Sequence, residues 1–484
     1  MTLSTRTARR IALSVAIVYM VATAVALYQD QMWPLLIPVA AAAIALCVTR
    51  IEETLVFIAF CTPFAIDVAV YDGMELSVPT EPLMILVSAV FLFRVLAVRT
   101  YDKALLRHPV SVLLLLSLGW MLATALVSND TAVSLKYLAA RLWFVIPFYF
   151  AAATFFRNPH RIRQLFGAYA TALAVVVVVT TCKTLGNVQD LQVLHRVMRP
   201  FYNDHTAYGC VTALFLPGTI HYIFERGAKV WQRMLYIALT MVLATGLAFS
   251  YCRAAWISLA GACGIYLMIR WGMKLKWMAL IAVAGIGMFF AHQSDILYKM
   301  SKNTQDSSLT LSGQIQSISN ISTDASNLER LNRWACAFRM FAEKPLSGYG
   351  PGTYQFFYGS YQRSDQLSTI STNAGDLGNA HSEYIGPLAE QGVMGLLLVT
   401  ALFLCTFATG VRVHRTAADP AMRTLALTLT LCLTTYYIHG FFNNFLDTDK
   451  LSVPFWAFTA AIVSIDRYAE KRPEAGRLHP ATKD

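Results

Sequence analysis

The stretch Asn379-Ala380-His381-Ser382-Glu383-Tyr384-Ile385-Gly386 lies where the longest polar segment of the chain runs into a hydrophobic run. Glu390-Gln391-Gly392-Val393-Met394-Gly395 follows a few residues later. One imidazole and several carboxylates are therefore expected at the boundary between water and a lipid bilayer. Chemistry on a lipid-linked substrate would take place at such a boundary.

The composition of the chain is that of a membrane protein. Of its 484 residues, 56% are hydrophobic and only 14% are charged, and the mean hydropathy is +0.50, whereas about a quarter of the residues of a soluble domain are charged. The net charge of +11 does not indicate a nucleic-acid partner, because the basic residues form short clusters between apolar runs. These clusters indicate membrane topology instead.

Apolar runs long enough to span a bilayer need about 20 residues. The sequence predicts an all-α, polytopic helical bundle of about twelve to fourteen such helices, the first of which we expect to be a retained signal anchor. The predicted spans are 11–27, 33–49, 54–70, 82–98, 109–127, 137–156, 164–185, 206–224, 231–249, 254–270, 276–292, 385–411, 422–440 and 451–466.

Basic residues fall into alternate connections, as the positive-inside rule requires. Arg94, Arg99, Lys103 and Arg107 share one connection, whereas the turns at 28–32 and 71–81 have no basic residue. This pattern predicts that both termini are cytoplasmic. In a bacterium with two membranes, the protein would lie in the inner membrane and the segment 293–384 would be in the periplasm.

Four regions follow from this topology: a transmembrane bundle over 1–292, a periplasmic loop or lid over 293–384, transmembrane helices over 385–466, and a cytoplasmic tail over 467–484. Within the loop, the polar stretch 301–326 is expected to be loose. Residues 328–341 have apolar side chains at helical spacing and predict an amphipathic helix against the membrane surface. A turn rich in glycine follows at 348–352.

Arginines on the outer side are candidates for binding a diphosphate. Arg253 lies in a short outer turn, and its guanidinium offers a bidentate fork that matches phosphate oxygens; the alternative is that it extends to lipid headgroups. Arg330 and Arg333 share a face of the predicted amphipathic helix, with Trp334 one turn from Arg330. A solvated basic face remains the alternative for this pair.

Other outer residues are candidates for contacts with sugar. The loop from 199 to 205 has hydrogen-bond acceptors and an aromatic pair that could stack on a sugar. A further arginine, Arg141, lies near the outer end of the predicted span 137–156. These candidates are Arg141, Arg199, Asn203 and His205.

His381 is the candidate general base, because an imidazole accepts a proton from a hydroxyl near neutral pH. A hydrogen-bonded structural histidine is the alternative. Glu383 and Glu390 are its candidate partners, with a structural role as the alternative for Glu390, which lies about two turns further into the helix. Glu383 and Tyr384 are candidate substrate-binding residues. The nine cysteines form no C-x-x-C pair, and the sequence has neither a metal-binding cluster nor a phosphate-binding glycine loop. We therefore expect no metal ion or other cofactor, with arginines neutralising the leaving group.

Four segments, taken in order, resemble the O-antigen ligase and polymerase family. They are Tyr202-Asn203-Asp204-His205 through Leu216-Pro217, Ser250-x-x-Arg253-x-x-Trp256, Arg330-x-x-x-Trp334 through Pro351-Gly352, and the His381 motif.

The resemblance implies a helical bundle of the C-type glycosyltransferase kind and a donor glycan linked to undecaprenyl diphosphate. Arg253 and Arg330 would hold the diphosphate, and His381 would activate or orient the acceptor hydroxyl in a metal-independent, inverting displacement. Membrane lipids are the other expected partner.

The motifs that the family shares do not identify the acceptor. A ligase uses lipid A-core, a polymerase uses a second lipid-linked glycan, and a protein O-oligosaccharyltransferase uses Ser or Thr; a single long periplasmic loop favours the ligase narrowly. A transporter of lipid-linked glycans is an alternative of a different class, but it predicts charged or broken helices at the bilayer midplane. A purely structural scaffold leaves the outward Arg and His residues unexplained.

Overall fold

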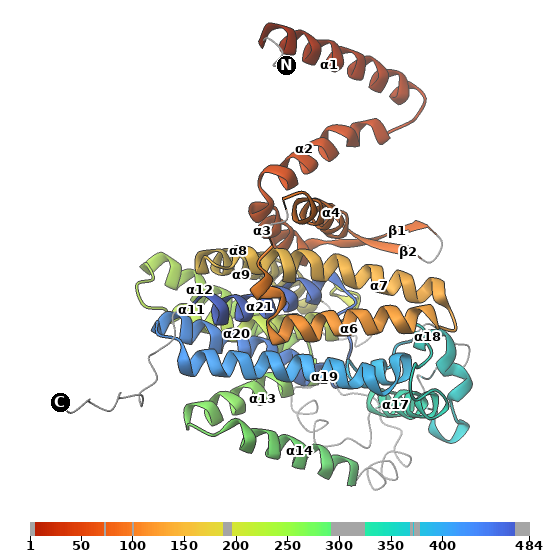
Figure 1. Ribbon diagram of the computed structural model, residues 1–484, viewed down its shortest axis with the longest axis vertical. Coiled ribbons are helices and arrows are strands. Elements are labelled where there is room, and N and C mark those ends of the chain that lie inside the picture. Colours follow the sequence, from red (N-terminus) through yellow and green to blue (C-terminus); the bar gives the residue numbers. More distant parts are fainter. Residues whose placement is uncertain are drawn as a thin grey trace, which may run out of the picture. The chain divides into compact units, whose positions relative to one another are not determined.

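The computed structural model describes residues 5–71, 74–98, 101–186, 196–291, 325–367, 371 and 378–469, and almost all of its regular structure is helical (Figure 1). The chain forms two compact units, residues 1–54 and 55–484. In the first unit, α1 (Thr5–Tyr28), η1 (Trp33–Leu35) and α2 (Leu36–Thr49) follow one another. Tyr19 Oη donates to the carbonyl of Pro34 at 2.7 Å, joining α1 to η1.

The second unit contains most of the predicted spans as helices. α3 (Ile51–Cys61) crosses the boundary into it. The remaining elements are η2 (Thr62–Phe64), β1 (Ile66–Tyr71), β2 (Met74–Val78), α4 (Thr80–Val98), α5 (Lys103–Leu106), α6 (Pro109–Leu126), α7 (Thr131–Val145), η3 (Ile146–Ala151), α8 (Ala152–Phe155), α9 (Pro159–Leu185), α11 (His205–Ile223), α12 (Val230–Phe249), α13 (Arg253–Arg270), α14 (Leu275–Ala291), α17 (Ala325–Glu343), α18 (Tyr354–Phe357), η4 (Tyr358–Tyr361), η5 (Ser364–Gln366), α19 (Ile385–Thr416), α20 (Pro420–His439) and α21 (Asp449–Tyr468).

The predicted span 54–70 is wrong in its second half, because β1 and β2 form an antiparallel hairpin there. The helix ends at Cys61, since Pro63 has no backbone N–H to donate. The next residues alternate between apolar and polar in Ile66-Asp67-Val68, which is the period of a strand rather than a helix. Ile66 pairs with Val78 and Val68 with Leu76, so these apolar residues share one face of the hairpin.

The helix at the centre of the second unit is α21. Every residue from Asp449 to Ile465 is buried, and α21 packs against α7, α8, η3, α19 and α20 (Figure 1). A helix that is apolar all round is expected inside a bundle rather than at its surface. The segment that precedes α21, residues 440–448, is thereby held close to the bundle axis.

Polar contacts join turns that the topology predicts on the same side of the membrane. On the predicted outer side, Thr80 Oγ1 donates to Asp449 Oδ2 at 2.7 Å, and the backbone N–H of Asn129 donates to Tyr349 O at 3.0 Å. These contacts place the hairpin, the 128–130 turn and the 344–352 loop at one end of the bundle.

The opposite end is joined by a second set of ion pairs. Asp466 Oδ2 lies 3.2 Å from His108 Nε2 and 2.8 Å from Arg412 Nη2, and Arg163 pairs with Glu225 at 2.5 Å. All of these residues belong to connections or helix ends predicted to be cytoplasmic. The contact pattern is therefore consistent with the predicted alternation of the helices.

Two glycines allow the backbone of the glycine-rich turn to approach the backbone of α19 closely. Gly392 interrupts the helix with φ +68°, and a Cβ there would lie 2.2 Å from the carbonyl oxygen of Leu346. Gly348 has φ +64°, and a Cβ there would lie 2.3 Å from the carbonyl carbon of Glu390. Both positions need a left-handed conformation without a side chain. The backbone N–H of Gly350 then donates to Glu390 O at 2.8 Å.

Six helices among the described residues are long and apolar enough to cross a membrane: Thr80–Val98, Pro109–Leu126, Thr131–Phe155, Pro159–Leu185, Val230–Phe249 and Ile385–Thr416. They match six of the predicted spans, and the other spans form shorter or less apolar helices or, at 66–71, a strand. The fold class predicted from the sequence, an all-α polytopic membrane bundle, is confirmed. The count of twelve to fourteen crossings stays a prediction.

The predicted amphipathic helix 328–341 corresponds to α17, which begins three residues earlier and ends two residues later. Of the stretch 301–326 that we expected to be loose, residues 301–324 lie outside the described residues, and its last two residues begin α17. The predicted tail 467–484 also lies outside them from residue 470.

Candidate functional site

The segment that carries His381 has a defined local structure. His381 has φ +49°, and its backbone N–H donates to Asn379 Oδ1 at 3.1 Å. Ser382 Oγ accepts from the N–H groups of Tyr384 and Ile385, each at 3.3 Å, and so caps the start of α19. The short polar residues of this motif therefore make the turn that presents His381 ahead of the helix.

Glu383 joins the His381 segment to the loop before α21. Its Oε1 accepts from the N–H groups of Phe445 and Leu446, both at 2.9 Å, and from the hydroxyl of Tyr436. The Glu383 backbone N–H donates to Gly440 O at 2.8 Å. These four hydrogen bonds join Glu383 to residues of α20 and of the loop before α21, so Glu383 holds this loop in place.

Tyr384 is also occupied by contacts within the bundle. Its hydroxyl donates to Tyr437 O at 2.8 Å, and its ring packs edge-on against Phe403 with the centroids 5.6 Å apart. Its predicted contact with substrate stays a prediction.

The arginines of α17 approach the His381 segment in two different ways. Arg330 Nε donates to Phe442 O at 3.2 Å. Arg333 is buried; its Nε pairs with Glu329 Oε1 at 2.8 Å and its Nη1 donates to Asn379 O at 3.1 Å. Arg333 therefore supports the backbone two residues before His381.

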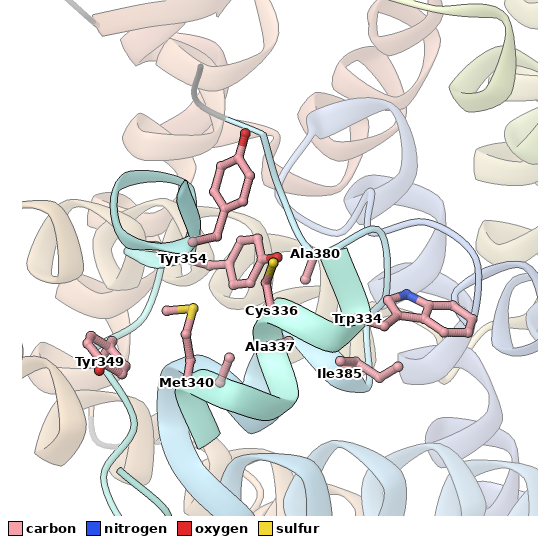
Figure 2. Packing of buried hydrophobic residues seen from close by; sticks show 10 residues of the cluster. Trp334, Cys336, Ala337, Met340, Tyr349, Tyr354, Ala380 and Ile385 are labelled. Carbon is pink, nitrogen blue, oxygen red and sulfur yellow. The ribbon is translucent and has the colours of Figure 1, made fainter. Parts of the chain in front are cut away.

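Trp334 belongs to a buried cluster beneath this segment. It packs against Phe441 with ring centroids 5.2 Å apart, and the cluster also contains Met340, Ala380 and Ile385 (Figure 2). Figure 2 shows that these side chains come from α17, from the 380–385 segment and from the loop around Tyr349 and Tyr354. The side chain is 6% exposed, and its predicted contact with a sugar stays a prediction.

Arg253 is the first residue of α13, where the helix dipole adds to its positive charge. The preceding turn is tightly packed against α11, because a Cβ on Gly209 would lie 2.7 Å from the Cβ of Cys252. Burial raises the pKa of the Cys252 thiol to about 11, and the charge of Arg330 opposes this shift. Arg330 thus lies near the start of α13.

The pKa of His381 shows that Arg330 also lies near the imidazole. The pKa of His381 is lowered to about 3, chiefly by burial and in smaller part by the charges of Arg330 and Arg333, which the charge of Asp204 opposes. The imidazole is therefore neutral at physiological pH and has one nitrogen available as an acceptor. Arg330 thus lies near both Cys252, the residue before α13, and His381. We call Arg253, Arg330 and His381 together the arginine–histidine site, and the place of the Arg253 side chain in it stays a prediction.

The loop before α11 is only partly drawn into this site. Asp204 caps α11 by accepting from the N–H groups of Thr206 and Ala207 at 2.7 and 2.8 Å, and His205 begins the helix. Asn203 Nδ2 donates to Asp67 Oδ2 of the hairpin at 3.2 Å. The side chain of Arg199 is exposed.

Arg141 lines a cavity of about 550 Å³. Its Nη1 donates to Leu446 O and its Nη2 to Tyr137 Oη, both at 2.9 Å. Asn379, Ala380, Ser382 and Glu383 line the cavity, whereas His381 does not. Arg141 therefore belongs to a cavity that His381, Arg253 and Arg330 do not line.

Three polar residues near these sites were not selected from the sequence. Asp204 was noted only as part of a loop. His439 ends α20 in a buried position with Nε2 3.1 Å from Asn443 Nδ2. Asp447 has its pKa raised to about 6 by burial and by the charge of Glu383. The sequence could have indicated these three residues, because each lies near the outer end of a predicted span, where ionisable residues are candidates for function.

The part of the chain that the structure describes contains no group of three or more His, Cys, Asp or Glu side chains that could hold a metal ion.

The fold is that of an all-α, multi-pass membrane protein, and in it Arg330 lies near both Cys252, just before α13, and the neutral His381. A family model described as O-antigen ligase matches residues 238–400, which include Arg253, Arg330 and His381. The match covers about a third of the chain and supports the resemblance to the O-antigen ligase and polymerase family that the motifs predicted. Members of this family are membrane glycosyltransferase-like enzymes, and the family implies lipid-linked glycan substrates in general. A search of curated proteins found no match.

Proposed function

We propose that the protein transfers a glycan from undecaprenyl diphosphate to an acceptor hydroxyl on the periplasmic face of the inner membrane. The observation that carries this proposal is the proximity of the Arg330 charge both to the start of α13, where Arg253 lies, and to His381. Two guanidinium groups beside a helix N-terminus suit a diphosphate. A neutral imidazole next to them suits an attacking hydroxyl.

In the proposed reaction, the bond between the anomeric carbon and the diphosphate oxygen breaks as the acceptor oxygen attacks from the opposite side. The diphosphate leaves with the bonding electron pair, and its negative charge is neutralised by Arg253 and Arg330. The acceptor proton passes to the imidazole of His381. A single displacement inverts the anomeric centre.

The low pKa of His381 ties its basicity to the bound donor. In the free protein, the arginine charges and burial keep the pKa at about 3. A diphosphate bound to these arginines compensates their charge and raises the pKa of the imidazole. We therefore propose that donor binding makes His381 a stronger base by offsetting the arginine charges, while burial remains the larger cause of its low pKa.

We propose lipid A-core as the acceptor, which would make the protein a ligase. A second lipid-linked glycan, for a polymerase, and Ser or Thr, for a protein glycosyltransferase, are the alternatives. The division into a bundle over 1–292, a lid over 293–384, helices over 385–466 and a tail is part of the same proposal.

The test is transfer in vitro from an undecaprenyl-diphosphate glycan, with lipid A-core and a second donor molecule offered separately. Wild type is compared with His381→Asn, because asparagine tolerates a positive φ but has no basic ring nitrogen. Product on lipid A-core that is lost in the variant supports a ligase, and lengthened donor chains alone indicate a polymerase. If a folded wild-type protein transfers to neither acceptor, the proposed function is wrong.

A further inference from the structure

The ends of three helices meet beside the His381 segment. α11, α13 and α20 pack against one another in pairs, and the topology predicts that α11 and α13 begin, and α20 ends, on the outer side. Just after α20, Gly440 O accepts from the N–H of Glu383, two residues after His381, at 2.8 Å. Arg330 Nε donates to Phe442 O of the same turn at 3.2 Å. The start of α11 is therefore expected close to this turn, to Arg330 and to the His381 segment.

Asp204 is the N-cap residue of α11. Its Oδ1 accepts from the N–H groups of Thr206 and Ala207 at 2.7 and 2.8 Å and from the hydroxyl of Thr206 at 2.6 Å. Its Oδ2 has no hydrogen-bond partner among the described residues, and its side chain is only partly buried. Cys252 Sγ lies 3.9 Å from Thr206 O, so this turn also contacts the start of α13. One carboxylate oxygen caps the helix, and the other remains for interactions in the site.

The charges of Asp204 and Arg330 act on the same three groups. These groups are the thiol of Cys252 before α13, the imidazole of His381, and the imidazole of His439 at the end of α20. They come from three different elements, and charges of opposite sign reach each of them. Asp204 and Arg330 therefore lie near one another at the arginine–histidine site, in agreement with the packing of the helix ends.

A carboxylate at this site opposes the binding of the donor. In the proposed reaction Arg253 and Arg330 hold a diphosphate, and a negative charge close to them repels it. The same reaction gives His381 a positive charge when the imidazole takes the acceptor proton, and the charges of Arg330 and Arg333 oppose that protonation. A nearby carboxylate favours the protonated imidazole. The charge that develops on His381 is thus a physical reason for an acid at this position.

We infer that Asp204 is a positioning residue of the transfer reaction, whose negative charge stabilises the imidazolium of His381 as the acceptor hydroxyl attacks. The inference rests on the proposed function. The proton passes from the acceptor oxygen to the imidazole, and Asp204 itself takes no proton. No hydrogen bond joins Asp204 to the ring of His381 among the described residues, so the carboxylate acts through its charge.

The first variant is Asp204→Asn, because asparagine caps a helix as well as aspartate does but carries no charge. The rate constant of a single turnover is measured at saturating donor and acceptor, together with the Kd of an undecaprenyl-diphosphate glycan in detergent. We expect the rate constant to fall about 2- to 10-fold, as for a base that loses about one pKa unit and takes the proton partly or fully. We expect the donor Kd to fall about 2- to 5-fold, because a repelling charge is removed.

Asp130→Asn is the matched control. Asp130 is also an N-cap residue at a predicted outer helix end, and its Oδ1 accepts from the N–H of Val133 at 3.1 Å. Its charge is not among those that lower or raise the pKa of His381. The control should therefore keep the wild-type rate constant and donor Kd. Asp204→Ser, which also caps a helix without a charge, is the second variant and replaces the first if Asp204→Asn does not fold.

A slower turnover together with tighter donor binding supports the inference. An unchanged rate constant in a folded, uncharged variant overturns it. Weaker donor binding also overturns it, because the substitution would then have disturbed the diphosphate site rather than the charge beside His381.

Failure of the proposed function gives a different result. If wild type binds the donor but transfers it to neither acceptor, the proposed function is wrong, and with it the role of Asp204 in transfer. If wild type transfers, His381→Asn does not, and Asp204→Asn matches wild type, the role of Asp204 is wrong while the proposed function stands.

Discussion

Replacing Glu383 distinguishes a supporting role from a catalytic one. Among the described residues, Glu383→Ala removes the one acceptor of the Leu446 N–H and of the Tyr436 hydroxyl, while the Phe445 N–H keeps a bond of 3.1 Å to Tyr436 Oη. Each unpaired buried donor costs about 1–3 kcal/mol, so the two together cost about 2–6 kcal/mol. That is a large part of a typical stability of about 5–15 kcal/mol. We expect Glu383→Ala to have a much lower free energy of unfolding, or to fold without an ordered 440–448 loop.

Glu383→Gln is the informative companion, because its Oε1 still accepts from the same donors. Bonds to a carboxylate are roughly twice as strong as neutral ones, so we expect a loss of about 1–2 kcal/mol and retention of most of the transfer activity. Thermal unfolding in detergent and the kcat and KM for transfer are measured for both variants. A Gln variant that is as stable as wild type but inactive would refute the supporting role and show that the charge of Glu383 takes part in the reaction.

Four other predictions concern the site and the turn that supports it. Arg253→Lys should lower kcat/KM at least about tenfold, because an ammonium cannot replace a bidentate fork; full activity would remove its proposed contact with the diphosphate. EDTA should leave the transfer rate unchanged, and a rate restored only by added metal would contradict neutralisation by arginine. Gly392→Ala should lower the yield and Tm of folded protein through its clash with Leu346, whereas Gly264→Ala, with nothing within 4 Å, should be neutral or slightly stabilising. Finally, since the folded pKa of His381 is about 3 and an unfolded histidine titrates near 6.5, wild type should lose stability as the pH falls from about 6.5 toward 3. His381→Asn should lose less Tm between pH 7 and 4.5, and an equal loss would contradict the buried neutral imidazole.

Most helices of the fold were predictable from local pattern. The spans around 82–98 and 109–127 and the amphipathic helix at 328–341 were recognised from apolar length or spacing alone, and their bounds differ from the structure by a few residues. The exception is the hairpin β1–β2. β1 directly follows a helix and is apolar on average, so a window of mean hydropathy joins the two into one apolar run. Mean hydropathy does not distinguish a strand, with a period of two residues, from a helix, with a period of 3.6.

The candidate site was predictable as a set of residues but not as a set of roles. Arg330 and Arg333 looked equivalent on one helix face, and both lie near His381. Arg333 is nevertheless buried in a pair with Glu329 and supports Asn379, whereas Arg330 donates to Phe442 O and lies near Cys252, just before α13. The spacing of residues along a helix states which side chains share a face. It does not state which of their donors are used by carbonyls and carboxylates from distant parts of the chain.

By itself, the sequence determined the fold class, the family resemblance and the boundary at which His381 lies, because hydropathy, basic clusters and short motifs are local properties. Only the tertiary structure decided that Glu383 holds the 440–448 loop and that Arg141 lines a cavity to which Asn379, Ala380, Ser382 and Glu383 contribute but His381 does not. Burial, pairing and cavities depend on contacts between residues far apart in the chain, and no local pattern contains them.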